Sequence, residues 1–156
     1  MITAPISITK MVLGKFFAAF SVLLITVLVS LIYPLIVVIY GKVYLGELFA
    51  GYLGFILQGA FFIALDMHLS ARASSPAIAA VLAFGANMLL WLLDVVNAAV
   101  DLSVLSSFLD FISPYIRYQP FTLGQLSFGS LMYYLLSIAL LLFFSVRMLD
   151  KRRWSE

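Results

Sequence analysis

Long apolar runs separated by short polar stretches dominate the hydrophobic pattern of this chain. Four of these runs contain no charged side chain, at residues 16–40, 48–65, 73–93 and 127–146. A helix rises about 1.5 Å per residue, so about 20 residues cross the hydrocarbon core of a bilayer, which is roughly 30 Å thick. The pattern therefore predicts four transmembrane helices, with Pro34 kinking the outer third of the first.

The composition agrees with a chain that faces lipid. Hydrophobic residues make up 65% of the 156 residues and charged residues 10%, against roughly 45–50% apolar residues in soluble domains. We therefore expect one all-α membrane domain over residues 1–156. In this helical bundle, small residues such as Gly54 and Gly59 let the helices approach closely. Oligomers or partner chains are also expected, because the apolar surface is spread over several spans.

Basic residues set the expected orientation, because short loops rich in Lys and Arg stay in the cytoplasm. With the N-terminus inside, seven basic residues are cytoplasmic and two, Lys42 and Arg117, are outside. The sequence therefore predicts that both ends of the chain lie in the cytoplasm. The cytoplasmic residues are Lys10 and Lys15 before the first span, Arg72 between the second and third, and Arg147, Lys151, Arg152 and Arg153 in the tail 147–156.

Residues 94–126 form the one long connection, placed outside by this orientation. Apolar residues recur in it at three- and four-residue spacing, which is typical of a short amphipathic helix at the membrane interface. These residues are Leu102, Leu105, Leu109 and Ile112. Ser113-Pro114 is expected to end this helix, and a second, re-entrant element is expected from about Phe121. A plain connector and a gating or substrate role fit the pattern equally well.

Residues that could carry chemistry are scarce. The chain has no cysteine and one histidine, so Asp66 and His68 offer two metal ligands where a catalytic zinc site takes three. Both lie at the cytoplasmic end of the second span beside Arg72, and Asp94 lies at the outer end of the third. We interpret these groups as surface anchors, because each can reach the interface. No catalytic residue, metal site or cofactor is therefore expected.

Nucleotides and nucleic acids are not expected as direct ligands either. The formal net charge of +2 is too small to indicate nucleic-acid binding. The pairs Gly14-Lys15 and Gly41-Lys42 lack the upstream glycine and the following Ser or Thr of a phosphate-binding loop. Any nucleotide-driven step must therefore be powered by a different chain.

Several stretches resemble the membrane subunits of ABC type-2 transporters. Thr3–Phe20 (TAPISITKMVLGKFFAAF) resembles the passage that leads from the cytoplasmic coupling helix into the third span of these permeases. Leu141–Trp154 (LLFFSVRMLDKRRW) resembles the last span and basic tail of the gliding-motility and copper-processing branch. Further similar stretches are Tyr33–Val37, Gly51–Leu65 and Ala80–Asp94. The resemblance covers the last four of the family's six spans, so a fragment, a split-gene product and a misassigned start all remain open.

The resemblance implies a permease subunit of the prokaryotic plasma membrane, with export as the expected direction. It implies pairing with a second permease chain and with cytoplasmic ATP-binding-cassette ATPase subunits. Within the coupling-like segment 1–15, the residues that would receive the motion of the ATPase are Pro5, Lys10, Gly14 and Lys15. The outer gate candidates are Leu105, Leu109, Ile112 and Pro114. The alternative interpretation is a non-catalytic four-helix membrane scaffold or assembly factor.

Overall fold

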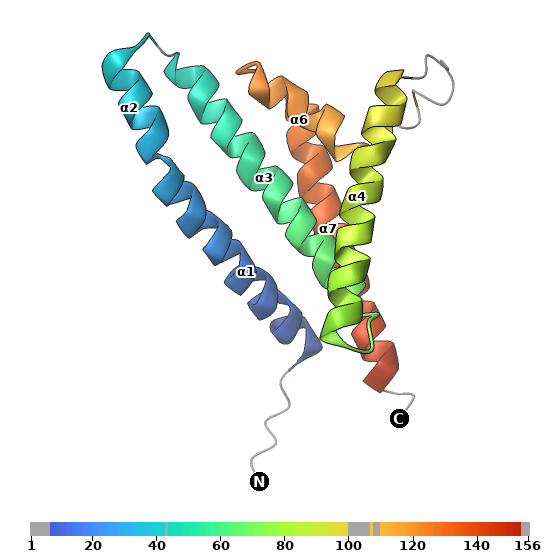
Figure 1. The fold of residues 1–156 in the computed structure, drawn as a ribbon. Helices are drawn as coiled ribbons and strands as arrows, with labels where there is room; N and C mark the ends of the chain where they lie inside the picture. Colours follow the sequence, from blue (N-terminus) through green and yellow to red (C-terminus); the bar gives the residue numbers. More distant parts are fainter. Residues whose placement is uncertain (1–6, 43, 100–106, 108–109, 154–156) are drawn as a thin grey trace.

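The computed structural model describes residues 7–42, 44–99, 107 and 110–153, and no strand occurs among them. Its helices are α1 (Ile8–Ser30), α2 (Ile32–Tyr40), α3 (Leu45–Ser70), α4 (Pro76–Ala99), α6 (Pro114–Thr122) and α7 (Phe128–Arg153) (Figure 1). The helical stretches long and apolar enough to cross a membrane are Ile8–Tyr40, Leu45–Ser70, Pro76–Val96 and Phe128–Lys151. The prediction of an all-α membrane bundle with four spans is confirmed.

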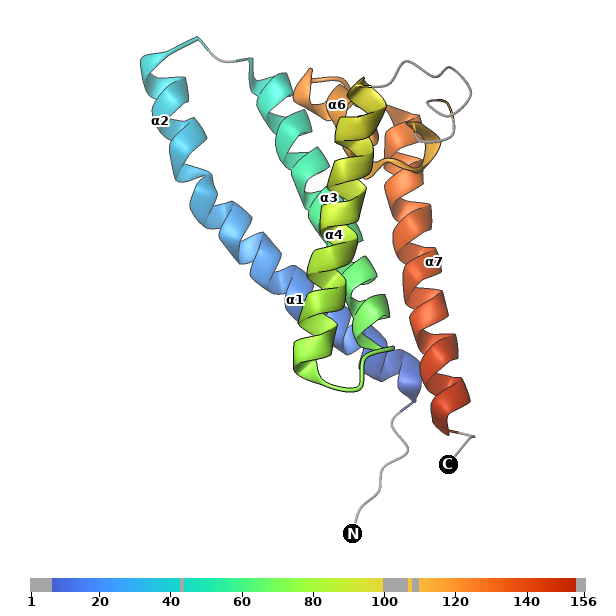
Figure 2. The same cartoon turned by 45° about the vertical axis from the view of Figure 1, so that its right-hand side comes forward.

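The bundle has two distinct ends. The start of α1, the turn between α3 and α4, and the end of α7 lie at one end, and the α2–α3 turn and α6 lie at the other (Figures 1 and 2). Alternating spans produce this arrangement, because each one reverses the direction of the last. We call the first the cytoplasmic end, following the orientation that the basic residues favour, and the second the outer end.

The first span begins earlier than the uncharged run that predicted it. Ser7 caps α1 by accepting a hydrogen bond from the backbone N–H of Lys10 at 3.4 Å, so the helix starts at Ile8 instead of Phe16. The basic residues of this segment therefore belong to the same continuous helix as the membrane span. A push applied to its first turns would be transmitted along the helix axis.

Pro34 disturbs this helix in a specific way. α1 ends at Ser30 and α2 begins at Ile32, because Pro34 has no N–H to donate to the carbonyl of Ser30 one turn earlier. The hydroxyl of Tyr52 on α3 donates to that carbonyl at 3.3 Å instead. The break expected at Pro34 is therefore present, and α3 satisfies the carbonyl that it leaves free.

The helix α3 occupies the centre of the bundle and packs against α1, α4, α6 and α7. Small residues make this possible: Ala50, Gly54, Ala60 and Ala64 are buried on α3. A Cβ atom added to Gly54 would lie 2.5 Å from the Cβ of Phe121, and one added to Gly59 would lie 2.7 Å from a methyl of Leu23. The packing role predicted for these two glycines agrees with these distances.

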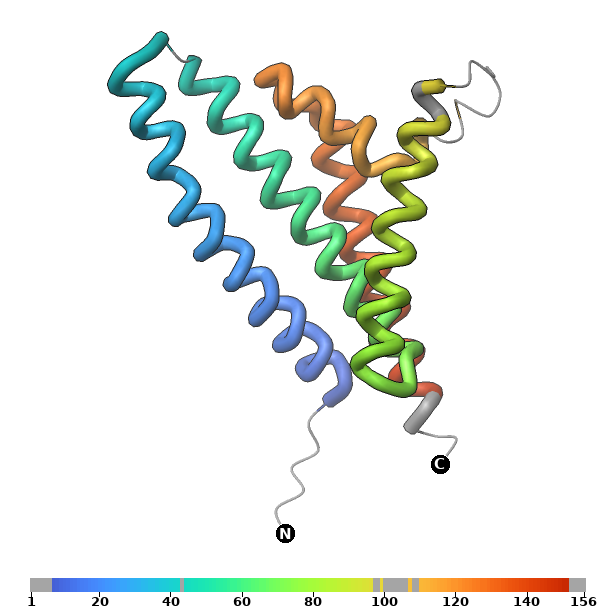
Figure 3. The backbone as a smooth tube through the Cα atoms, in the orientation of Figure 1, coloured from blue at the N-terminus to red at the C-terminus, as the bar shows by residue number. Residues whose placement is uncertain are grey.

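The outward-facing helices carry much exposed apolar surface. No residue in the most apolar stretch of α4 is buried, and few are in that of the first span. Val81 and Phe84 on α4 are each 71% exposed, and Leu28 on α1 is 65% exposed. α2 continues the first span away from the rest of the bundle (Figure 3). Lipid or further helices must cover these faces, since water cannot do so favourably.

Candidate functional site

The predicted coupling residues lie on an exposed face at the cytoplasmic end. Lys10, Gly14 and Lys15 are all exposed on the first turns of α1, whereas Pro5 lies outside the described residues. Their neighbours Val12 and Phe16 are buried and fix this part of α1 to the bundle. A Cβ atom at Gly14 would meet nothing within 4 Å. The packing within this chain therefore does not require a glycine at that position.

A cavity of about 230 Å³ opens beside this face, between α1, the end of α3 and α7. Its lining residues are Met11, Val12, Lys15, Met67, Ser70, Ala71, Ala73, Ser145 and Leu149. The start of the first span, the α3–α4 turn and the last helix thus meet at one place. An element inserted there would contact three of the four spans at once.

The basic residues of the α3–α4 turn and of the tail, which we interpret as anchors of the predicted topology, divide into two groups. Arg72, Arg147 and Lys151 line a second cytoplasmic cavity together with His68, so the structure brings residues from α7 and from the α3–α4 turn together. Arg152 and Arg153 end α7, but their side chains lie outside the described part of the chain. The sequence interpretation placed His68 beside Arg72, and the two side chains are hydrogen-bonded at 2.9 Å.

The outer gate candidates are only partly described. Leu105 and Leu109 lie outside the described residues. A helical stretch ends at Ile112, directly before Ser113-Pro114, as expected. Pro114 also begins α6, because proline has no N–H that needs a partner in the first turn of a helix. Ser113 caps this helix by accepting from the N–H of Ile116 at 3.4 Å. The second short element therefore starts at Pro114, and Phe121 lies near its end.

Tyrosine hydroxyls fix the chain around Pro114 to α7. Tyr134 is fully buried, and its hydroxyl donates to the carbonyl of Pro114 at 2.5 Å. The hydroxyl of Tyr133 donates to the carbonyl of Ile112, also at 2.5 Å. A carbonyl at the end of a helical stretch, such as that of Ile112, needs such a donor in an apolar environment. The two gate candidates that are described thus contribute their backbone to the contact with α7.

The other contacts of α6 and its flanks come from α3 and α4. Phe121 is fully buried and packs directly on Gly54 of α3. The Ser113 hydroxyl donates to Asp94 of α4 at 3.3 Å, so Asp94 has a structural partner that the sequence interpretation did not anticipate. Burial, followed by the negative charge of Asp94, raises the pKa of Tyr115 on α6 above its ordinary value. α6 is thereby tied to three spans at the outer end.

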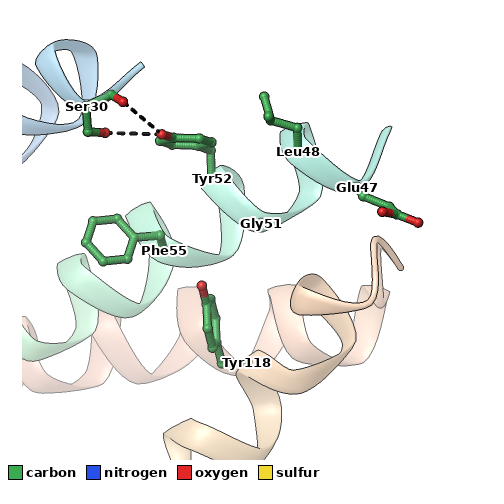
Figure 4. A pocket seen from close by; sticks show the side chains of 7 residues that line it. All are labelled: Ser30, Glu47, Leu48, Gly51, Tyr52, Phe55 and Tyr118. Atoms are coloured by element: carbon green, nitrogen blue, oxygen red, sulfur yellow. Dashed lines mark hydrogen bonds between the residues drawn. The ribbon is translucent and has the colours of Figure 1, made fainter. Parts of the chain in front are cut away.

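A pocket of about 420 Å³ lies beside α6, at the outer end of α1 and α3. Figure 4 shows Tyr52 turned towards Ser30 of α1, and Tyr118 pointing from α6 towards α3. The remaining lining residues are Glu47, Leu48, Gly51 and Phe55. Pockets of this size accommodate small molecules. Its lining combines apolar side chains with two tyrosine hydroxyls and a carboxylate, which suits an amphipathic molecule.

Polar side chains also meet between α3 and α4. The Asn87 amide donates to Asp66 Oδ1 at 3.2 Å, and Asn87 lies about three turns into α4. The sequence interpretation placed Asp66 near the interface and did not pair it with Asn87. The sequence did offer one signal: Asp66 and Asn87 are strongly polar residues in neighbouring spans, where such side chains tend to hydrogen-bond to each other.

The described residues contain no group of three or more His, Cys, Asp or Glu side chains that could hold a metal ion. No protein-family model, curated protein or solved structure matches the chain significantly.

Proposed function

We propose that this chain is a membrane permease subunit of an ABC-type transporter, working as an exporter in a prokaryotic plasma membrane. A separate cytoplasmic ATPase would hydrolyse the ATP, and a second permease chain would complete the transport path. The resemblance of Thr3–Phe20 and Leu141–Trp154 to type-2 permeases motivates this proposal. The geometry of α1 provides independent support.

The observation that carries the proposal is that α1 reaches from the cytoplasmic end of the bundle to the outer pocket. This helix of 23 residues is about 35 Å long. Its first turns carry the exposed Lys10 and Lys15, and its last residue, Ser30, lines the outer pocket through its contact with Tyr52. If an ATPase moved the basic end of α1, the other end of the helix would therefore move at the outer pocket.

The helix α6 would act as the outer gate in this scheme. It borders the pocket through Tyr118 and is held to α7 by the hydroxyl of Tyr134. A displacement of α1 relative to α3 would change the pocket on one side while α6 stays in place on the other. Transport would then be mechanical, with no catalytic residue in this chain.

The test is to co-express the tagged chain with an ABC ATPase whose gene neighbours its own, and to purify it in mild detergent. We expect stable co-purification and a changed rate of ATP hydrolysis. The K10E/K15E variant should no longer bind the ATPase, because two negative charges would replace the two positive charges of the docking face. The single variant K42E changes a charge at the outer end and should keep it.

Two results would contradict this proposal. If the ATPase bound K10E/K15E as well as the unchanged chain, the basic face of α1 would not be the docking surface. If the chain purified alone and left hydrolysis unchanged, the scaffold interpretation would be favoured. The exposed apolar faces of α4 and of the first span would then serve to hold other membrane helices.

A further inference from the structure

A second cytoplasmic cavity, of about 370 Å³, lies between the end of α3 and α7. Its lining residues are His68, Arg72, Phe144, Arg147, Met148 and Lys151. Among the described residues, this lining contains three cations and no carboxylate. Cations placed at a cytoplasmic end merely to set orientation need not converge on one cavity. Their convergence here indicates a site for an anion.

A chain of hydrogen bonds orients the guanidinium of Arg72. The hydroxyl of Ser145 donates to the carbonyl of Leu141 at 2.7 Å, so its oxygen is available to accept from His68 Nδ1 at 3.3 Å. This network assigns the proton of a neutral imidazole to Nδ1. Nε2 then accepts from Arg72 at 2.9 Å. His68 thus helps to hold the guanidinium of Arg72 in position in the cavity wall.

The helix α7 supplies the rest of the cavity wall from one face. Phe144, Arg147, Met148 and Lys151 follow the spacing i, i+3, i+4 and i+7, which places them on the same side of a helix. The guanidinium of Arg147 lies over the ring of Phe143, 5.2 Å from its centre. Along this stripe apolar and basic residues alternate, from Phe144 deeper in the span to Lys151 near the end of the helix.

This combination of apolar and basic groups suits a phospholipid in the cytoplasmic leaflet. Acyl carbons would lie along Phe144 and Met148, and a phosphate would lie among Arg72, Arg147 and Lys151. The planar guanidinium groups bind phosphate oxygens in pairs, and lysine adds a point charge. Basic pockets between membrane helices on this side commonly bind anionic head groups. We propose that this cavity binds the phosphate group of an anionic phospholipid.

The proposal is independent of any ATPase and can be tested on the chain by itself. The full chain is purified in mild detergent, and binding of phosphatidylglycerol and phosphatidylcholine is measured by native mass spectrometry. We expect phosphatidylglycerol to bind more tightly. R147Q/K151Q should weaken its binding by about fivefold for each charge removed. R147K/K151R keeps both charges and should retain most of the binding.

The matched control is K10Q/K15Q, which removes two positive charges from the same end but outside the cavity, and it should leave binding nearly unchanged. Equal losses in both double variants would overturn the proposal in favour of a diffuse surface charge. Equal binding of the two lipids would also overturn it. A third arm uses inorganic phosphate as competitor: displacement of the lipid at equal concentration would assign the site to soluble phosphate instead. If R147Q/K151Q fails to purify, K151Q replaces it, with about a fivefold loss expected.

Discussion

The cytoplasmic and outer halves of the bundle are held together by different means. In the cytoplasmic half, Phe16 of α1 packs on the small side chains of Ala60 and Ala64, with larger apolar residues around them. In the outer half, the core consists of the large rings of Phe61, Phe121 and Tyr134. Regular helices in close contact need no further polar partners, because their backbones are already satisfied.

The outer half cannot be built in this way, because its chain is not continuous helix. The helical stretch before α6 ends at Ile112, and Tyr133 of α7 donates to its carbonyl, while Tyr134 donates to the carbonyl of Pro114 in the first turn of α6. The break before Pro34 leaves another carbonyl, to which Tyr52 donates. Interruptions of the helices thus account for the hydrogen bonds that Tyr133 and Tyr52 donate in this half. We therefore expect outer-half variants to cost more stability the more buried contact they remove.

The largest effect is expected from Gly54→Ala. Its new Cβ would lie 2.5 Å from the Cβ of Phe121, so α6 must shift away from α3. We expect a loss of about 2 kcal/mol in the free energy of unfolding, measured by denaturant titration in mild detergent. The control is Gly85→Ala on α4, where a Cβ would meet nothing within 4 Å. Equal stability of the two variants would show that α6 does not rest on Gly54.

Next in size is Tyr134→Phe, which removes the donor for the carbonyl of Pro114. The ring stays buried while the carbonyl loses its partner, so we expect a loss of about 1.5 kcal/mol. Limited proteolysis should also cut the connection before α7 more readily. Tyr44→Phe is the matched control, because Tyr44 is 76% exposed and should tolerate the change. If Tyr134→Phe resisted proteolysis as well as the unchanged chain, ring packing alone would hold α6.

The serine caps of α1 and α6 differ in the same manner as the two halves. Ser113 is buried, caps α6 and also donates to Asp94, whereas Ser7 is exposed and caps α1. We expect Ser113→Ala to lower the free energy of unfolding by about 1 kcal/mol and Ser7→Ala by about half as much. Thermal unfolding of both variants in one detergent measures the difference. A larger loss in Ser7→Ala would contradict this prediction, because the cap of α1 would then contribute more to stability than the cap of α6.

The sequence predicts the four spans well because the bilayer itself fixes the length of an uncharged run. It places the start of α6 poorly, at about Phe121 instead of Pro114, although Ser113-Pro114 does end a helical stretch as predicted. That a new helix begins directly at Pro114 depends on the cap at Ser113 and on contacts with Gly54 and Tyr134, which are far away in the chain. The order Ser-Pro was a readable signal for a helix start, since serine favours the cap position and proline the first turn.

The candidate sites show the same limit of local patterns. The basic residues of the cytoplasmic end were recognised individually as topology anchors. That Arg72 shares a cavity with Arg147 and Lys151 depends on how α3 and α7 pack, which hydrophobic periodicity does not specify. Pairing of Asp66 with Asn87 depends likewise on the depth at which α4 meets α3. Pro34, in contrast, indicated a free carbonyl at Ser30 directly, although not which residue would satisfy it.

The smallest effect concerns that carbonyl and can be isolated by a double-mutant cycle. Tyr52→Phe removes its donor and should cost about 0.5 kcal/mol, a typical value for hydrogen bonds between membrane helices. Pro34→Ala supplies a backbone N–H that can bond to Ser30 within the helix. The cost of Tyr52→Phe should therefore shrink in the Pro34→Ala background, as measured by unfolding of all four forms. Tyr40→Phe, at a residue 87% exposed, should show the same small cost in both backgrounds. If Tyr52→Phe also cost the same in both, the tyrosine would not be compensating for the proline, and the hydroxyl groups of the outer half would need an explanation other than irregular backbone.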